Sequence, residues 1–119
     1  MLSRSQIIEL FASIDEKNRE KFVMFLTRNC SFRFGNLPVV HGVNAISEFV
    51  GGFFDSIASL NHELSEIWPV PGGTVCHGTV SYVRHDKSVL SVPFSTVFKV
   101  DGDKISEYLI FADTSELYS

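Results

Sequence analysis

The sequence predicts an α+β fold in which three N-terminal helices cover one face of a curved antiparallel sheet. Apolar residues recur at helical spacing in three segments before residue 58, and from Ser59 onward the period changes to two. Turn-forming sequences divide the second half into four strand-like runs, as in consecutive hairpins. Helices followed by such a meander are typical of an α+β layout, with the helices packed on one side of the sheet.

Two short helices are expected at the beginning of the chain. Ser3 and Gln6 have the spacing of a capping box, and apolar residues then recur at helical spacing up to Ile14. Asn18 is a suitable N-cap for the second helix. The apolar side of that helix is expected to contain Phe22, Phe25 and Leu26.

A short strand is predicted over Cys30 to Phe34, and a third helix begins near Gly42. Gly51 and Gly52 lie inside this helix, where each costs about 1 kcal/mol relative to Ala. They permit either a close backbone approach or a bend. The apolar stripe of the helix is Val43, Ile46, Val50, Phe53 and Ile57.

Four strands are predicted at about 59–68, 74–84, 88–100 and 104–113. The connecting sequences PVPGG, HDKS and DGD are hairpin signals. With turns centred on Gly72, between Asp86 and Lys87, and on Gly102, one row of cross-strand partners forms on one face. That row contains His62, Tyr82, Ser91 and Asp113.

This row predicts a polar stripe on an otherwise apolar surface, which is how small-molecule pockets are usually lined. The expected catalytic residues are Asp113, His62 and Tyr82. The expected substrate-binding residues are Phe11, Phe32, Phe53, Leu60, Leu64, Val80, Ser91, Pro93, Leu109 and Phe111.

Each polar candidate has two interpretations. Asp113 is either a pocket carboxylate with a raised pKa or a strand-end residue that bonds the backbone in an Asx turn. His62 is either a proton shuttle or a core histidine with its hydrogen bonds satisfied. Tyr82 either orients a ligand oxygen through its hydroxyl or packs as an aromatic side chain.

The opposite face of the predicted sheet is apolar as well. Because only one face can meet the helices, we expect a homodimer across this second face. The residues assigned to it are Leu90, Val92, Phe94, Phe98, Tyr108 and Ile110.

Composition argues against several classes of partner. The net charge is −4, and no run of Lys and Arg supplies a surface for nucleic acid. No apolar stretch approaches the length of a membrane span, and the N-terminus does not have a signal-peptide pattern. Cys30 and Cys76 are expected to be buried, reduced thiols of a cytoplasmic protein, with a single disulfide as the less favoured alternative. No metal-ligand spacing or nucleotide fingerprint is present, so we expect no metal and no cofactor.

The order of these features resembles the nuclear transport factor 2-like superfamily, and within it the SnoaL-like group. The resemblance covers residues 1–119 as a single domain. It rests on the two leading helices, HGVNAISEFV in the third helix, LNHEL in the first long strand, FKVDGDKISEY in the last hairpin and the closing FADTSEL. It implies a cone-shaped sheet and helices that enclose a deep apolar pocket, and frequent dimerisation through the sheet.

The resemblance also implies a choice of functions. In the cyclases of this group an aspartate of the last strand is the acid/base residue, and Asp113 is at the matching position. Ketosteroid isomerases carry a base aspartate after the first strand, but SFRFGNLP contains no carboxylate here. We therefore expect acid/base chemistry, such as cyclisation, isomerisation or dehydration, on a small apolar oxygenated molecule. The alternative is a binding or interaction module without catalysis.

Overall fold

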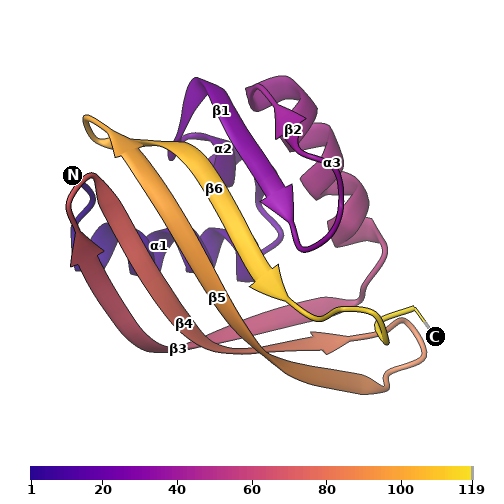
Figure 1. Ribbon diagram of the computed structural model, residues 1–119. Helices are drawn as coiled ribbons and strands as arrows, with labels where there is room; N and C mark the ends of the chain where they lie inside the picture. Colours follow the sequence, from indigo (N-terminus) through magenta and orange to yellow (C-terminus); the bar gives the residue numbers. More distant parts are fainter. Residues whose placement is uncertain (119) are drawn as a thin grey trace.

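A computed structural model describes residues 1–118 and shows an α+β fold of three helices on a six-stranded sheet (Figure 1). The helices are α1 (Arg4–Asp15), α2 (Arg19–Val23) and α3 (Val43–Asp55). The strands are β1 (Leu26–Phe34), β2 (Val40–His41), β3 (Ser59–Val70), β4 (Gly73–Val83), β5 (Val89–Asp101) and β6 (Lys104–Ala112).

The sheet is curved and does not close, and its strand order is β2-β1-β6-β5-β4-β3. Neighbouring strands are antiparallel except β1 and β6, which are parallel. In Figure 1, α1 runs across the sheet behind β4 and β5, and α3 lies beside β1 and β2. The helices therefore cover the concave face, as the sequence predicts. Among residues 1–118 no helix has the length and apolar character needed to cross a membrane.

The start of the first helix is confirmed, whereas the extent of the second is not. The Ser3 hydroxyl accepts from the Gln6 backbone N–H, and the Gln6 side chain accepts from the Ser3 N–H, which completes the capping box. The α2 helix ends at Val23. Phe25 and Leu26 do not extend it, and Leu26 begins β1 instead. The two-residue strand β2 was not predicted, because a segment so short has no period to detect.

Gly51 in α3 permits a close contact with α2. A Cβ atom at this position would lie 2.1 Å from the Nη1 atom of Arg19. The Arg19 side chain therefore lies directly over α3, and its Nη1 donates to the Ser47 carbonyl at 3.5 Å. The neighbouring atoms all belong to a side chain, so the close backbone approach expected for this glycine is not observed.

The β3–β4 hairpin keeps the predicted faces although its register differs. A two-residue turn joins Val70 to Gly73, and a bulge between Leu64 and Glu66 shifts the pairing by one more residue. The two shifts together move the pairing by an even number of residues. His62 thus lies opposite Val80 rather than Tyr82, but all three side chains stay on the concave face.

In the β4–β5 hairpin, by contrast, the difference in register changes which side chains lie on each face of the sheet. Its connection spans residues 84–88 and pairs Val83 with Val89, so the turn centres on Asp86. The Arg84 N–H donates to the Ser88 carbonyl, and Lys87 adopts a positive φ of 73°. This shift of one residue moves each side chain of β5 to the opposite face from the one predicted. The β5–β6 pairing differs from the predicted register by two residues, which preserves the faces of β6 relative to β5, so the side chains of β6 are also on the opposite face.

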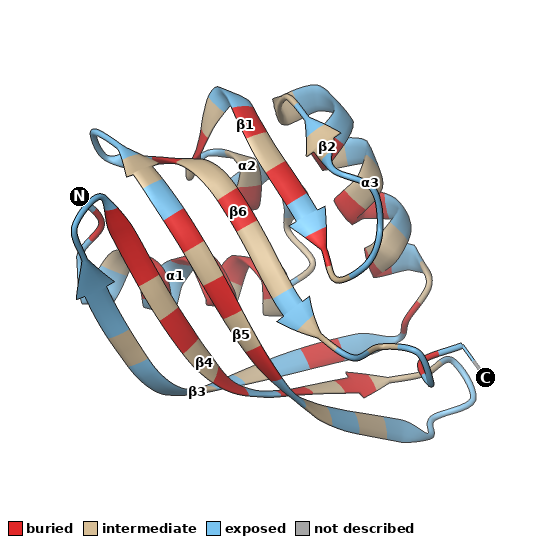
Figure 2. Ribbon diagram, in the orientation of Figure 1, coloured by how far each residue is buried: buried red, intermediate tan, exposed pale blue. Residues whose placement is uncertain are grey.

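The predicted face assignment of the last two strands is therefore wrong. Ser91, Pro93, Leu109 and Phe111 lie on the outer face of the sheet, with Phe111 55% exposed. The residues assigned to a dimer face point inward, and Phe94, Phe98 and Tyr108 are buried in the core. Figure 2 shows the resulting alternation of buried and more exposed positions along β4 and β5.

Candidate functional site

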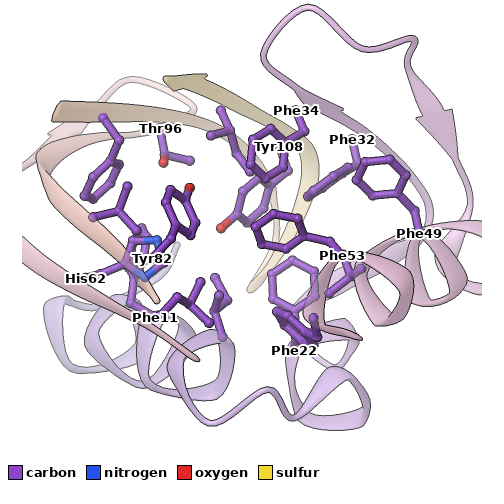
Figure 3. A pocket seen from close by; sticks show the side chains of 17 residues that line it. Phe11, Phe22, Phe32, Phe34, Phe49, Phe53, His62, Tyr82, Thr96 and Tyr108 are labelled. Atoms are coloured by element: carbon purple, nitrogen blue, oxygen red, sulfur yellow. The ribbon is translucent and has the colours of Figure 1, made fainter. Parts of the chain in front are cut away.

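A small cavity lies between the helices and the concave face of the sheet. Seventeen residues line it, from α1, α2, α3 and all the long strands (Figure 3). The volume of the cavity that the centres of water molecules can occupy is about 40 Å³. Most of the lining is Phe and aliphatic side chains. The side chains with a polar atom are His62, Tyr82, Thr96 and Tyr108.

Some of the residues predicted for a pocket line this cavity. Phe11, Phe32, Phe53, Leu60 and Val80 line the cavity together with His62 and Tyr82. Leu64 is half-buried on the same face but lies outside the lining, and the four outer-face residues named above are excluded by their register. The sequence prediction missed Phe22, Phe34, Phe49, Phe94, Thr96 and Tyr108.

The main polar feature at the cavity wall is a pair formed by His62 and Asp15. The His62 Nδ1 atom lies 2.6 Å from Asp15 Oδ1, and the His62 backbone N–H donates to Oδ2 at 3.0 Å. Their side chains are 11% and 22% exposed, respectively. An ionised carboxylate can only accept, so Nδ1 carries the proton and Nε2 keeps its lone pair. Nε2 has no hydrogen-bond partner among residues 1–118.

Neighbouring contacts hold this pair in place. Asp15 is the last residue of α1 and lies one turn after Phe11, whose ring is 4.9 Å from the His62 ring. Phe94 packs edge-on against His62 at 5.1 Å, and its ring also lies 5.8 Å from that of Phe11. Just beyond the helix, Lys17 donates through Nζ to the Ile57 carbonyl at 2.6 Å. The end of α1 is thus fixed against the start of β3.

Asp15 was not predicted as a site residue. The apolar run that predicts the first helix ends at Ile14, and Asp15 is the polar residue that follows it. A signal was nevertheless present, because residues four apart share one face of a helix. Asp15 follows Phe11 by that spacing and therefore points to the same side of α1.

Tyr82 and Tyr108 present hydroxyl groups to the cavity (Figure 3). Both residues are buried, and neither hydroxyl has a hydrogen-bond partner among residues 1–118. Burial raises the pKa of Tyr82 above its usual value, and the nearby Tyr118 raises it further. The pKa of Tyr108 is raised well above normal, mainly by burial. Both phenols therefore remain neutral hydrogen-bond donors at physiological pH.

The structure places Asp113 outside the cavity. It follows the end of β6, is exposed, and accepts a hydrogen bond from the Ser115 N–H at 3.0 Å. Hydrogen bonds from the side chain and backbone of Ser115 lower the pKa of this carboxyl. The predicted pocket position and raised pKa are wrong, and the Asx-turn interpretation is the one observed. Ser91 is also elsewhere, because its hydroxyl pairs with that of Ser81 on the outer face at 2.7 Å.

The two cysteines are free and buried. Burial raises the pKa of Cys30 to about 11 and that of Cys76 to about 12. Both thiols therefore stay protonated at neutral pH, which is the inert state of the group. In the described part of the chain, no three His, Cys, Asp or Glu side chains are grouped so that they could hold a metal ion.

Comparison with known proteins agrees with this architecture. A SnoaL-like protein from Jannaschia sp. CCS1, named as a polyketide cyclase, has a TM-score of 0.81 at 16% identity; the alignment covers 93% of this chain and 85% of that one. An NTF2-like protein of unknown function from Burkholderia pseudomallei has a TM-score of 0.85 at 14% identity, over 93% and 90% of the two chains.

A third structure, from Catenulispora acidiphila, has a ketosteroid isomerase-like fold and was solved with trimethylamine. Its TM-score is 0.83 at 10% identity, and the alignment covers 93% of this chain and 86% of that one. At such identities these similarities show a shared fold. No curated protein sequence matches the chain. The family model for the SnoaL-like domain matches residues 7–108. The chain therefore belongs to the SnoaL-like family.

Proposed function

We propose that this protein catalyses cofactor-independent proton transfer next to a carbonyl group, with His62 as the general base. The observation that carries the proposal is the two-point contact of Asp15 with the ring and the backbone of His62. This contact keeps the proton of the neutral His62 ring on Nδ1. The lone pair of Nε2 is therefore free at the wall of the apolar cavity. Cyclisation, isomerisation and dehydration can all begin with such a proton transfer.

The proposed step uses groups already present at the cavity wall. Nε2 of His62 takes a proton from the carbon beside the carbonyl, and the C–H electron pair forms a carbon–carbon double bond. The carbonyl π electrons move to oxygen, which becomes an enolate. The neutral Tyr82 hydroxyl donates a hydrogen bond to that oxygen, where the negative charge develops. Asp15 does not touch the substrate; it orients His62 and stabilises the imidazolium that forms.

The size of the cavity supports a small ligand. A volume of about 40 Å³ holds only a few water molecules, because one water requires roughly 10–15 Å³ by the same measure. A larger ligand fits only if aromatic side chains move. Phe53, a half-buried residue of α3, is the side chain that we expect to move. The similar structure from Catenulispora acidiphila was solved with trimethylamine, which supports binding of a small molecule in a fold of this kind.

The test is exchange of the ring hydrogens next to the carbonyl of cyclohexanone in D2O, followed by NMR. We expect the protein to accelerate exchange, and His62→Gln to reduce the acceleration by about 10²–10⁴-fold. His77→Gln is the matched control, because His77 lies on the outer face against Trp68 and should leave the rate unchanged.

Two results would count against this function. If His62→Gln keeps the wild-type rate, His62 is not the base. If cyclohexanone binds to the wild-type protein with no acceleration of exchange, the protein is a binding module, which is the alternative function for the same cavity.

We further propose that the protein forms a homodimer through the outer face of the sheet. Trp68, Val89 and Phe111 are exposed there at 49%, 58% and 55%. The three side chains are spread along one face of the sheet, and exposed apolar surface on one face is typical of a contact surface. The check is light scattering at micromolar concentration, and a monomer would refute the dimer.

A further inference from the structure

The Tyr108 hydroxyl is a polar group of the cavity that has no role in the proposed proton transfer. Its side chain is almost completely buried, at 1% exposure, and its hydroxyl is without a partner among residues 1–118. No fully buried side-chain polar atom of the described residues lacks a hydrogen bond. The unpartnered Tyr108 hydroxyl must therefore reach open space, and the space it faces is the cavity.

The position of Tyr108 separates it from the His62–Asp15 pair. Tyr108 lies on β6, and its ring packs against Phe98 at 4.7 Å and Phe32 at 5.3 Å. His62 lies on the edge strand β3, and β5 and β4 separate this strand from β6 in the sheet. The Phe98 ring, which packs against Tyr108, lies 6.4 Å from the Phe11 ring, and the Phe11 ring lies 4.9 Å from His62. The cavity thus has polar groups in two places with apolar aromatic surface between them.

The chemistry of the lining restricts what Tyr108 can bind. None of the described lining residues is Lys, Arg, Asp or Glu. The Cys76 thiol donates to the Thr96 backbone carbonyl at 3.9 Å, and the hydroxyl groups of the lining are those of Tyr82, Thr96 and Tyr108. Burial and the neighbouring thiols and carboxylate all oppose ionisation of Tyr108, so it acts as a neutral donor. A buried ligand carboxylate would find no cation here, which makes its desolvation unfavourable.

We propose that Tyr108 is a specificity-determining residue that donates a hydrogen bond to a second oxygen of a neutral ligand. The first oxygen of that ligand lies between His62 and Tyr82, and in this respect the inference rests on the proposed function. The ligand class is a neutral apolar molecule with two separated acceptor oxygens, such as a diketone or a hydroxyketone. Molecules with one oxygen bind without the second contact.

The test compares two ligands of one ring size, cyclohexanone and 1,4-cyclohexanedione, by NMR titration. A neutral hydrogen bond changes affinity by up to about tenfold, so the wild-type protein should bind the dione about three- to tenfold more tightly. Tyr108→Phe should remove this preference while binding of cyclohexanone is unchanged. Tyr118→Phe is the matched control, because it removes a hydroxyl that pairs with Ser56 outside the cavity.

The outcomes separate this inference from the proposed function. Equal affinity of the wild-type protein for the two ligands overturns the role of Tyr108, and this result needs no variant to fold. A preference that persists in Tyr108→Phe overturns it as well. If the preference disappears in Tyr108→Phe while no variant or wild-type protein exchanges hydrogens, the binding role of Tyr108 stands and the catalytic proposal fails.

Discussion

Asp15 and Asp113 both occur where a secondary-structure element ends, yet their surroundings differ completely. Asp15 ends a helix that crosses the concave face, so its carboxylate meets His62 between the helix and the sheet. Asp113 follows the strand β6 at an exposed end of the sheet, and its hydrogen-bond partner among residues 1–118 is Ser115 in its own turn. A carboxylate at the end of a helix or strand can take part in a site when that end lies between the helices and the sheet. The apolar residues that precede the carboxylate in the sequence do not show whether this is so.

The largest effect on this comparison is expected from Asp15→Ala. The change removes the acceptor for two N–H groups of His62, and an unpaired buried donor costs about 1–3 kcal/mol. Urea unfolding should show this loss, with Asp15→Asn losing less because its amide oxygen still accepts one bond. If Asp113→Ala destabilises the protein as much as Asp15→Ala, the contrast between the two sites is wrong.

A smaller effect is expected from Arg84→Met, which tests what holds the turn after Asp113. The Arg84 guanidinium donates to the carbonyls of Leu117 at 2.8 Å and Glu116 at 2.9 Å. These bonds are partly exposed, so their loss should cost about 1 kcal/mol in urea unfolding. Arg33→Met, which removes one bond on an exposed strand residue, should cost less. Equal losses for the two variants would mean that Arg84 does not anchor the turn.

The smallest effect is expected from Asp113→Asn. Hydrogen bonds from Ser115 lower the pKa of Asp113, so the ionised group stabilises the folded state above its unfolded pKa. This contribution is lost as the pH falls through the lower folded-state pKa. Any Tm advantage of the wild-type protein over Asp113→Asn should therefore shrink below about pH 4. The cyclohexanone exchange rate should stay unchanged, and a tenfold loss would restore Asp113 as an acid/base candidate.

The sequence predicts the layers of this fold well, because layers depend on patterns that are local. The helix start at Ser3, the third helix and the four long strands follow from periodicity and capping. His62 and Tyr82 were placed on the correct face because the turn and the bulge of the first hairpin shift the register by a total that preserves it.

The positions of Ser91 and Asp113 could not be predicted in the same way. They depend on a single residue of register in the connection 84–88, where Lys87 adopts a positive φ without a glycine to indicate it. The pairing of Asp15 with His62 is also non-local, because it joins the end of a helix to a strand 47 positions later. Spacing along the chain indicates which way Asp15 points, but not which residue it meets.

The parallel pairing of β1 with β6 has a consequence for the order of folding. β1 is the first long strand and β6 the last, so their hydrogen bonds join opposite ends of the chain. Contacts between distant parts of a sequence slow folding, because bringing the two segments together costs chain entropy before the contacts stabilise the structure. Until β6 arrives, Phe32 on β1 has no Tyr108 to pack against. The joining of β1 to the rest of the sheet and the completion of the cavity should thus coincide in one late, cooperative step.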